Sequence, residues 1–286
     1  MKSFSIRKDE SEIMKYKIIV LDLDGTLTNS KKEISPATHE ALIDIQKQGY
    51  KVVLASGRPT PGVIKHAKEL HLKDYGGYIL SFNGAKIIDC RTDKVMFQKT
   101  LPPEVIPELY RIAVEAGVGI ISYDEGKVIA GTHIDEYIEL EAGINGLEIN
   151  LVSDFVSYIN YPVNKCLMTG EHEILLQVQK QLKSRYNSLL SIYFSEPFFL
   201  EIMPQNIDKA QSLLTLLNTI GISSDEMICC GDGFNDISMI QTAGLGVAME
   251  NAQDIVKEAA DYITRSNDDE GILYVIQKFM SNNSDS

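Results

Sequence analysis

Short apolar runs alternate with helical segments at both ends of the chain, and this alternation limits the fold more than any other feature of the sequence. The run KIIVLDL at 17–23 is followed by a helical segment that begins with Ser35 and Pro36, typical N-cap and first-turn residues, and stops at Gly49. The strand-like runs KVVLAS and GGYILSFN come next. Strands that alternate with helices in this way predict a parallel sheet with helices on its faces.

The alternation stops after Gly84 and returns near residue 202. Between these points lie the short runs AKIID and VMFQKT, a proline pair, a helical stretch near 104–116, the helix-like HEILLQVQKQLKSRY and the strand-like SIYFSEPFFLEIM. A helix at 206–220, the strand MICCG and further strand and helix patterns follow. We therefore predict an α/β fold with a doubly wound, parallel, Rossmann-like core at 16–83 and 202–286 and an inserted α+β domain at 84–201.

Composition and charge exclude several classes of partner. The net charge of −13 disfavours nucleic acid and anionic membrane surfaces, so neither is expected as a partner. No apolar stretch approaches the roughly 20 residues of a membrane helix, and residues 1–15 are polar and unlike a signal peptide. The cysteine spacing fits no zinc motif, which predicts reduced, buried thiols and a cytoplasmic protein. The cysteines are Cys90, Cys166, Cys229 and Cys230.

Carboxylates follow two apolar strands. Asp22 and Asp24 come directly after the first strand, before a glycine that lets the backbone turn sharply, and Asp232 and Asp236 follow the strand MICCG. Two such clusters at neighbouring strand ends would repel each other unless a divalent cation lay between them, and Mg²⁺ suits oxygen ligands. A capped turn is the simpler interpretation of the first cluster, and Asp236 has the alternative role of capping the next helix.

Two further segments carry groups that can bind phosphate. Ser56 and Gly57 end the second strand, where a hydroxyl and turn amides can donate to phosphate oxygens, although Ser56 is nearly as good an N-cap for the helix after Pro59. Lys209 lies near the start of the helix that follows the insertion, where the helix dipole disfavours a cation. A solvated surface lysine is the usual explanation, but because three other motifs suited to phosphate are present, we favour Lys209 as a phosphate ligand.

In this order, the motifs resemble the haloacid dehalogenase-like phosphatase superfamily, and the place of the insertion resembles its Cof-type branch, with a type II B cap. The resemblance covers roughly residues 16–280. It rests on DLDGTLT, SGRP, SFNGA, LEIMP before the helix of Lys209, GDGFNDISMI and AADYITRSNDDEGI. One departure is Ala210, which stands where the family usually has a glycine after its lysine.

The resemblance implies a role for each motif. It makes Asp22 the nucleophile and Asp24 the general acid and base, with Ser56 and Lys209 on the phosphate and Asn235 on the phosphate or substrate. Mg²⁺ would be held by the Asp22 carboxylate, the Asp24 backbone carbonyl, Asp232 and, directly or through water, Asp236. In this role Asp24 has to gain and lose a proton, so we expect neighbouring carboxylates to raise its pKa.

The resulting hypothesis is a magnesium-dependent phosphatase that hydrolyses small organic phosphate monoesters, such as sugar phosphates, through an aspartyl phosphate on Asp22. A phosphomutase or phosphotransferase with the same intermediate stays open, as does a non-catalytic protein that binds phosphometabolites. We expect a small phosphorylated metabolite as the partner of a monomer or homodimer. The insertion would cover the site and select the substrate, but its polar residues do not single out which side chains do so. Candidates there are Tyr123, Asp124, His133 and Glu141.

Overall fold

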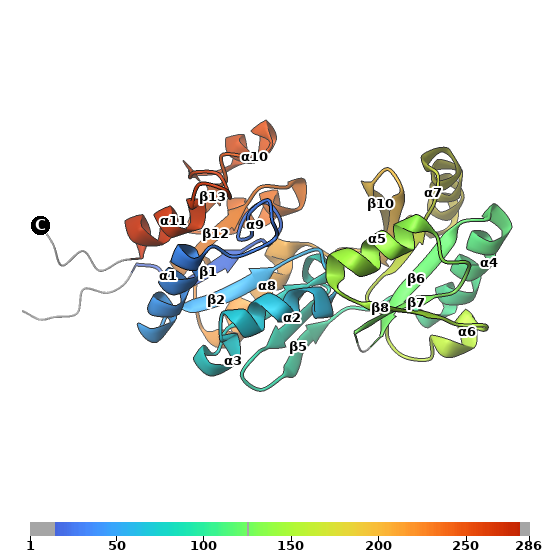
Figure 1. The fold of residues 1–286 in the computed structure, drawn as a ribbon, viewed down its shortest axis with the longest axis horizontal. Helices are drawn as coiled ribbons and strands as arrows, with labels where there is room; N and C mark the ends of the chain where they lie inside the picture. Colours follow the sequence, from blue (N-terminus) through green and yellow to red (C-terminus); the bar gives the residue numbers. More distant parts are fainter. Residues whose placement is uncertain (1–14, 125, 281–286) are drawn as a thin grey trace, which may run out of the picture.

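The computed structural model describes residues 15–124 and 126–280, and it contains two β-sheets, each with its own helices (Figure 1). The ends of the chain form the first sheet, at the left of Figure 1, and the middle of the chain forms the second, at the right. Residues 1–14, on which the expectation about a signal peptide depends, lie outside the described part.

The first sheet has eight strands in the order β14-β13-β12-β1-β2-β3-β4-β5. Strands β14 through β3 in this order run parallel, and β4 and β5 continue the sheet antiparallel. The parallel part confirms the predicted α/β class. The strand bounds are β1 Ile18–Leu21, β2 Lys51–Ala55, β3 Tyr78–Ser81, β4 Lys86–Asp89, β5 Lys94–Gln98, β12 Met227–Gly231, β13 Leu245–Ala248 and β14 Tyr262–Ile263.

Helices cover both faces of the parallel part of this sheet, which explains why strands such as β1 (IIVL) and β12 (MICCG) are continuously apolar and buried. Ile19 and Leu21 belong to a buried cluster shared with α1 and α11, whereas Val20 packs on the opposite face with Leu213 and Leu217 of α8. The helices of this unit are α1 Pro36–Lys47, α2 Thr60–Glu69, α3 Leu72–Tyr75, α8 Lys209–Ile220, α9 Ile237–Thr242, α10 Asp254–Ala259 and α11 Gly271–Phe279. Single 3₁₀ turns lie at Ser224–Glu226 and Phe234–Asp236, and a tight turn with positive φ lies at Phe82–Gly84.

Local capping sets where the predicted helices begin. The Ser35 hydroxyl accepts a hydrogen bond from the backbone N–H of Thr38, so α1 starts at the expected place. The helix predicted from residue 206 starts three residues later, because the Asp208 side chain caps it by accepting from Gln211 N–H. Lys209 is therefore the first residue of α8.

The second sheet has six strands in the order β10-β11-β9-β6-β7-β8, mostly antiparallel. One face packs on α4, α6 and α7, and part of the other face packs on α5. The strands are β6 Gly119–Asp124, β7 Lys127–Ala130, β8 Glu148–Leu151, β9 Cys166–Thr169, β10 Leu190–Glu196 and β11 Phe199–Pro204. The helices are α4 Ile106–Ala116, after a 3₁₀ turn at Pro103–Val105, α5 Glu136–Asn145, α6 Phe155–Tyr158 and α7 His172–Tyr186.

The pairing of the strands moves the boundaries expected at residues 84 and 201. Strands β4 and β5, which the sequence analysis assigned to the insertion, belong to the first sheet, where β4 pairs with β3 and β5 pairs with β4. Strand β11 continues to Pro204 in the second sheet, and the first sheet's helices resume with Lys209. The sequence pattern changes at Gly84 because the edge of the sheet turns antiparallel there, and this change was mistaken for the start of a new domain.

The Asn164 side chain binds both ends of the β4–β5 hairpin, where the chain passes from the first sheet to the second. Its side-chain amide is buried and donates to the backbone carbonyls of Ala85, at 3.1 Å, and Lys99, at 2.8 Å. Its carbonyl oxygen accepts from the Gln98 side chain. One residue of the second unit thus satisfies backbone groups on both sides of the β4–β5 hairpin.

Two expectations drawn from composition can be compared with the described residues. All four cysteines are free and buried, as expected. No helix within 15–124 and 126–280 combines the length and apolar character that a membrane span requires.

We predict that Asn164→Ala lowers the free energy of unfolding by about 1–3 kcal/mol, because it leaves the Lys99 carbonyl without its donor and the Ala85 carbonyl with only the backbone N–H of Lys99. Differential scanning calorimetry of wild type and variant measures the effect as a lower Tm. Asn160→Ala is the matched control, since Asn160 is exposed and its side chain has no hydrogen-bond partner among the described residues. An equal Tm for the two variants would show that the hydrogen bonds of Asn164 contribute nothing to the stability of the fold.

Candidate active site

Four neighbouring strands deliver the candidate residues to one edge of the first sheet. Asp22 follows β1, Ser56 follows β2, the turn Phe82–Gly84 follows β3 and Asp232 follows β12, and these strands are adjacent in the order β12-β1-β2-β3. Carboxyl ends of parallel strands share one edge, where ligands of open α/β sheets bind. Segments far apart in the sequence therefore meet at a single site.

The centre of the site is the Lys209 ammonium, which is buried between two carboxylates. Its Nζ donates to Asp22 Oδ1 at 2.7 Å, to Asp236 Oδ1 at 2.6 Å and to the backbone carbonyl of Ala55 at 2.9 Å. Only 1% of Lys209 is exposed. Three acceptors match the three donors of an ammonium group, so Lys209 is a fully bonded internal charge and the interpretation as a solvated surface lysine is wrong.

Asp236 joins the lysine to the loop after β12. Its Oδ2 accepts from the backbone N–H groups of Asp232 and Gly233, both at 3.0 Å. Asp236 stands at the N-cap position of α9, although its side chain makes no capping bond to that helix. Its bond from Gly233 N–H instead caps the 3₁₀ turn Phe234–Asp236 that leads into α9, so the alternative role holds for this turn. Asp232 is oriented separately, because Thr26 donates its hydroxyl to Asp232 Oδ1 at 2.7 Å.

Asp22, Asp232 and Asp236 form a group that suits a divalent cation. One carboxylate oxygen from each lies within 4.8 Å of the others. Oxygens on opposite sides of a Mg²⁺ ion are about 4.2 Å apart, given Mg–O distances of about 2.0–2.1 Å. The all-oxygen donor set therefore suits a hard divalent cation, although the limit of 4.8 Å is wider than the span across Mg²⁺.

The protonation of these groups reflects their burial. Burial raises the pKa of Asp22 well above its usual value, the nearby Asp236 carboxylate adds to this, and Lys209 opposes it. Burial also raises the pKa of Asp232 to about 6. Burial would lower the pKa of Lys209, but the two carboxylates outweigh it and raise that pKa. With all three carboxylates ionised, the cluster would carry more negative charge than its single ammonium balances. The raised pKa values of Asp22 and Asp232 favour protonation, which reduces this excess.

Asp24 faces away from this cluster, toward two cations. Arg58 donates Nε to Asp24 Oδ2 at 2.7 Å and Nη2 to Oδ1 at 2.6 Å, and Lys32 Nζ donates to Oδ1 at 2.8 Å. Burial alone would raise the pKa of Asp24, but Arg58 and then Lys32 outweigh it, and the pKa lies below its usual value. The expectation that neighbouring carboxylates raise this pKa is wrong, because the partner of Asp24 is a bidentate guanidinium.

The loop after β2 supplies a hydroxyl and a close-packed glycine. Ser56 is buried, and its hydroxyl accepts from the backbone N–H of Arg58 at 3.1 Å. It is not the cap of α2, whose N-cap is Pro59. A Cβ on Gly57 would lie 3.1 Å from Asn83 Oδ1, so the loop and this amide are packed together. Asn235 donates from Nδ2 to the same Asn83 oxygen at 3.0 Å.

Three residues of this site were not assigned by the sequence analysis. Arg58 lies within SGRP and Asn83 within SFNGA, so both stood inside quoted motifs without a role. Thr26, in DLDGTLT, orients Asp232. Sequence patterns mark such motifs, but they do not reveal which side chain meets which carboxylate.

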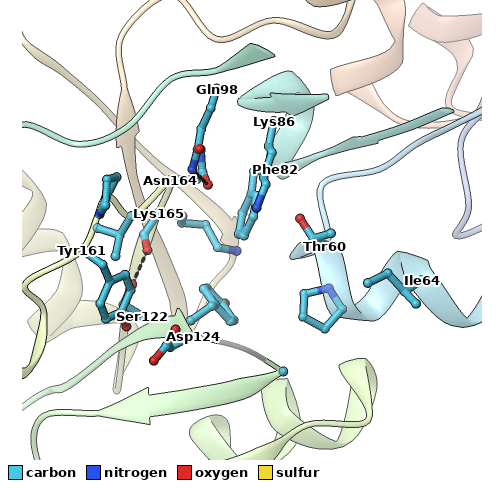
Figure 2. A pocket seen from close by; sticks show the side chains of 15 residues that line it. Thr60, Ile64, Phe82, Lys86, Gln98, Ser122, Asp124, Tyr161, Asn164 and Lys165 are labelled. Atoms are coloured by element: carbon cyan, nitrogen blue, oxygen red, sulfur yellow. Dashed lines mark hydrogen bonds between the residues drawn. The ribbon is translucent and has the colours of Figure 1, made fainter. Parts of the chain in front are cut away.

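A cavity of about 470 Å³ lies beside the site, between the two sheets (Figure 2). Thr60 and Ile64 of α2 border it on one side, and Ser122, Asp124 and Lys165 of the second unit border it on the other. None of the metal-binding candidates lines it. The cavity therefore does not contain the acidic cluster, and it meets the site's strand-end segments at Phe82 and Thr60.

Of the four residues named as cap candidates, two line the cavity and two do not. Tyr123 and Asp124 line the cavity, and the Tyr123 hydroxyl donates to Glu141 Oε1 at 2.6 Å. The Tyr123 ring also packs edge-on against Phe82, with 5.8 Å between centroids. His133 is exposed and lines no part of the cavity. A buried pair that the sequence analysis did not identify, Lys165 and Glu201 at 3.0 Å, lies close to Tyr123.

Comparison with known proteins agrees with this arrangement. A family model described as haloacid dehalogenase-like hydrolase matches residues 19–276. A solved structure of such a hydrolase from Bacteroides thetaiotaomicron is 49% identical, has a TM-score of 0.90 and covers 92% of this chain and 99% of its own.

Two relatives carry more specific names. The 5-amino-6-(5-phospho-D-ribitylamino)uracil phosphatase YcsE of Bacillus subtilis (strain 168) is 29% identical over 276 residues, which are 96% of this chain and 99% of that protein. The structure of the HAD subclass IIB sugar phosphatase BT4131 is 26% identical, has a TM-score of 0.76 and covers 92% of this chain and 98% of its own. Since the family match spans almost the whole described chain, this protein belongs to the haloacid dehalogenase-like hydrolases and is a phosphatase of their Cof-type branch.

Proposed function

We propose that this phosphatase hydrolyses small organic phosphate monoesters, with sugar phosphates as the leading class, through a phosphoryl-enzyme intermediate on Asp22 and with Mg²⁺ as cofactor. The observation that carries the proposal is the buried contact of Lys209 with both Asp22 and Asp236, next to Asp232. A sugar phosphatase and a ribityl-compound phosphatase among the relatives support this substrate class.

The first step assigned to Asp22 is attack on phosphorus. A carboxylate oxygen of Asp22 forms the new P–O bond while the bond from phosphorus to the alcohol oxygen breaks. The Lys209 ammonium, 2.7 Å from the same carboxylate, favours the ionised form of Asp22, and it would bind a phosphoryl oxygen by exchanging one of its three present acceptors for it. Bound Mg²⁺, with Asp22, the Asp24 carbonyl, Asp232 and Asp236 as ligands, would supply charge stabilisation to the phosphoryl oxygens.

Asp24 completes both halves of the reaction. It gives a proton to the departing alkoxide and later takes one from the water that attacks the aspartyl phosphate, so that the bond between Asp22 and phosphorus breaks and inorganic phosphate leaves. As the structure has it, Arg58 favours the ionised form of Asp24. Arg58 therefore has to loosen its hold on Asp24 before the first proton transfer, and an incoming phosphate dianion competes for the same guanidinium.

The remaining contacts with the substrate would come from the loops after β2 and β12 and from the second unit. Ser56, the amide of Gly57 and Asn235 would donate to the phosphate. The second unit, at 99–204, would act as the cap: Arg58 Nη1 donates to the Ile144 carbonyl of α5 at 3.4 Å, and a Cβ on Gly62 would lie 2.3 Å from Asn145 Oδ1. These close contacts support a cap that excludes water from the site.

A phosphotransferase would share the Asp22 step and pass the phosphoryl group to a sugar. Release of inorganic phosphate in water, with no phosphorylated second sugar when a sugar acceptor is added, separates the proposed hydrolase from that alternative. The hypothesis of a non-catalytic binding protein is disfavoured because this is a phosphatase by family.

We predict that Asp22→Asn abolishes turnover and phosphate labelling of the protein without lowering Tm. The amide keeps the shape of the side chain, and removing a carboxylate that burial disfavours relieves the neighbouring charges. Turnover of phosphate esters, acid-quench labelling and calorimetry are the measurements. Asp44→Asn, an exposed change in α1, is the control. Residual labelling of the Asp22 variant at the wild-type level would move the nucleophile elsewhere.

A second prediction concerns the cation. Turnover should vanish after exhaustive chelation, return with Mg²⁺ and fall with excess Ca²⁺, whose larger and looser coordination shell would misplace Asp22. Independently of activity, Mg²⁺ at 100 times its Kd should stabilise the fold by about 2.7 kcal/mol. Asp232→Asn should lose most of this shift in Tm. Full activity without metal, or an equal shift in the variant, contradicts the assignment.

A third prediction separates Asp24 from Asp22. Asp24→Asn should lower turnover of alkyl phosphates by about 10²–10⁴, the usual contribution of general acid–base catalysis. The loss should be smaller on p-nitrophenyl phosphate, whose leaving group departs without a proton. Steady-state kinetics on both substrates, with Tm measured alongside, tests this. An equal loss on both esters, together with a lower Tm, would assign Asp24 a role in stabilising the turn alone.

A further inference from the structure

The turn after β3 has an unusual backbone. Phe82, Asn83 and Gly84 all have positive φ, at 52°, 53° and 102°. Glycine accepts such angles, and asparagine adopts them more often than most residues, but a bulky residue such as phenylalanine rarely does. Backbone strain of this kind persists when surrounding contacts enforce it, and it concentrates at functional sites.

The backbone of this turn connects two parts of the active site. Phe82 N–H donates to the carbonyl of Arg58 and Asn83 N–H donates to the carbonyl of Ser56, both at 3.0 Å. On the other side, Ser212 of α8 donates its hydroxyl to the Gly84 carbonyl at 2.8 Å. The turn therefore links the Ser56–Gly57–Arg58 loop to the helix whose first residue is Lys209.

The side chain of Asn83 connects two more segments. Its Oδ1 accepts from Asn235 Nδ2 at 3.0 Å and lies against Gly57, where an added Cβ would come within 3.1 Å. Its Nδ2 donates to the Tyr193 hydroxyl at 3.2 Å, and Tyr193 belongs to β10 of the second sheet. The Asn83 amide thus contacts three segments: the Ser56–Gly57–Arg58 loop, the loop after β12 and the second unit.

We propose that Asn83 is a positioning residue for phosphate-ester hydrolysis: it holds the Asn235 amide beside Gly57 and makes that geometry depend on the second sheet through Tyr193. The proposal rests on the proposed function of the same site. An Asn235 amide that donates one hydrogen to Asn83 keeps its second hydrogen for a phosphate oxygen. Without Asn83, the exposed Asn235 side chain is free to rotate.

The decisive variant is Asn83→Gly, which keeps a residue suited to positive φ and removes only the amide. We expect kcat/KM to fall about 10- to 100-fold, because the hydrogen bond from Asn235 to the charged phosphate is lost. Tm should stay equal or rise, because the backbone strain at position 83 is relieved. Asp93→Gly is the matched control, since Asp93 has φ 57° in the exposed β4–β5 turn. It should leave kcat/KM unchanged.

A double-mutant cycle shows whether Asn83 acts through Asn235. If it does, Asn83→Gly combined with Asn235→Ala loses little more activity than Asn235→Ala alone. Tyr193→Phe, which removes only the hydroxyl, should raise KM in wild type and have little further effect on top of Asn83→Gly. Asn83→Asp provides a shape-matched second variant, which keeps the acceptor for Asn235 and loses the donor to Tyr193.

Independent, multiplicative losses in the cycle, or wild-type kinetics of Asn83→Gly, would overturn the proposal. The cycle measures coupling in any phosphatase turnover of the protein, whichever group is the nucleophile. Failure of the aspartyl-phosphate route would appear in Asp22→Asn, and failure of this inference would appear in the cycle, so the two outcomes are distinct.

Discussion

The Lys209 ammonium, enclosed by Asp22, Asp236 and the Ala55 carbonyl, is the contact on which the rest of the site depends. A buried charge is tolerated only when its partners satisfy it, and it is strongly destabilising when no counter-charge remains beside it. Lys209 enters the site only after the chain has returned from the second sheet. The acidic cluster is therefore complete only when both ends of the chain have folded together.

The second unit is connected to the chemistry through few but specific contacts. Arg58 binds Asp24 with two nitrogens and reaches the α5 carbonyl of Ile144 with a third. Gly62 permits the close approach of Asn145, since any Cβ there would collide with it. Arg58 thus links Asp24 to α5, and a change on the far side of the interface can affect Asp24 without touching it.

The sequence predicted the parts of the structure that local pattern controls. Apolar strands followed by aspartates placed Asp22 and Asp232 at strand ends, because a buried parallel strand and a polar loop leave clear signatures. The pattern did not show that β4 and β5 extend the first sheet, since an antiparallel hairpin looks the same at a sheet edge as at the start of a new domain. Nor did it predict a lowered pKa for Asp24, because the nearest charges by sequence are aspartates and the nearest in space is Arg58.

The balance of charge bears on the order in which ligands bind under the proposed function. Lys209, Arg58 and Lys32 face four carboxylates, so the ionised site carries an excess of negative charge within a protein whose net charge is already −13. A phosphate dianion that approached this site first would meet net repulsion at short range, where ionic screening is weak. A divalent cation reverses the sign of the site and lowers the pKa of the buried Asp22 and Asp232 carboxyls toward ionisation. Under the proposed function we therefore expect the cation to bind before the substrate. The same acidic cluster that repels an anion in the empty site would then attract it once the cation is bound.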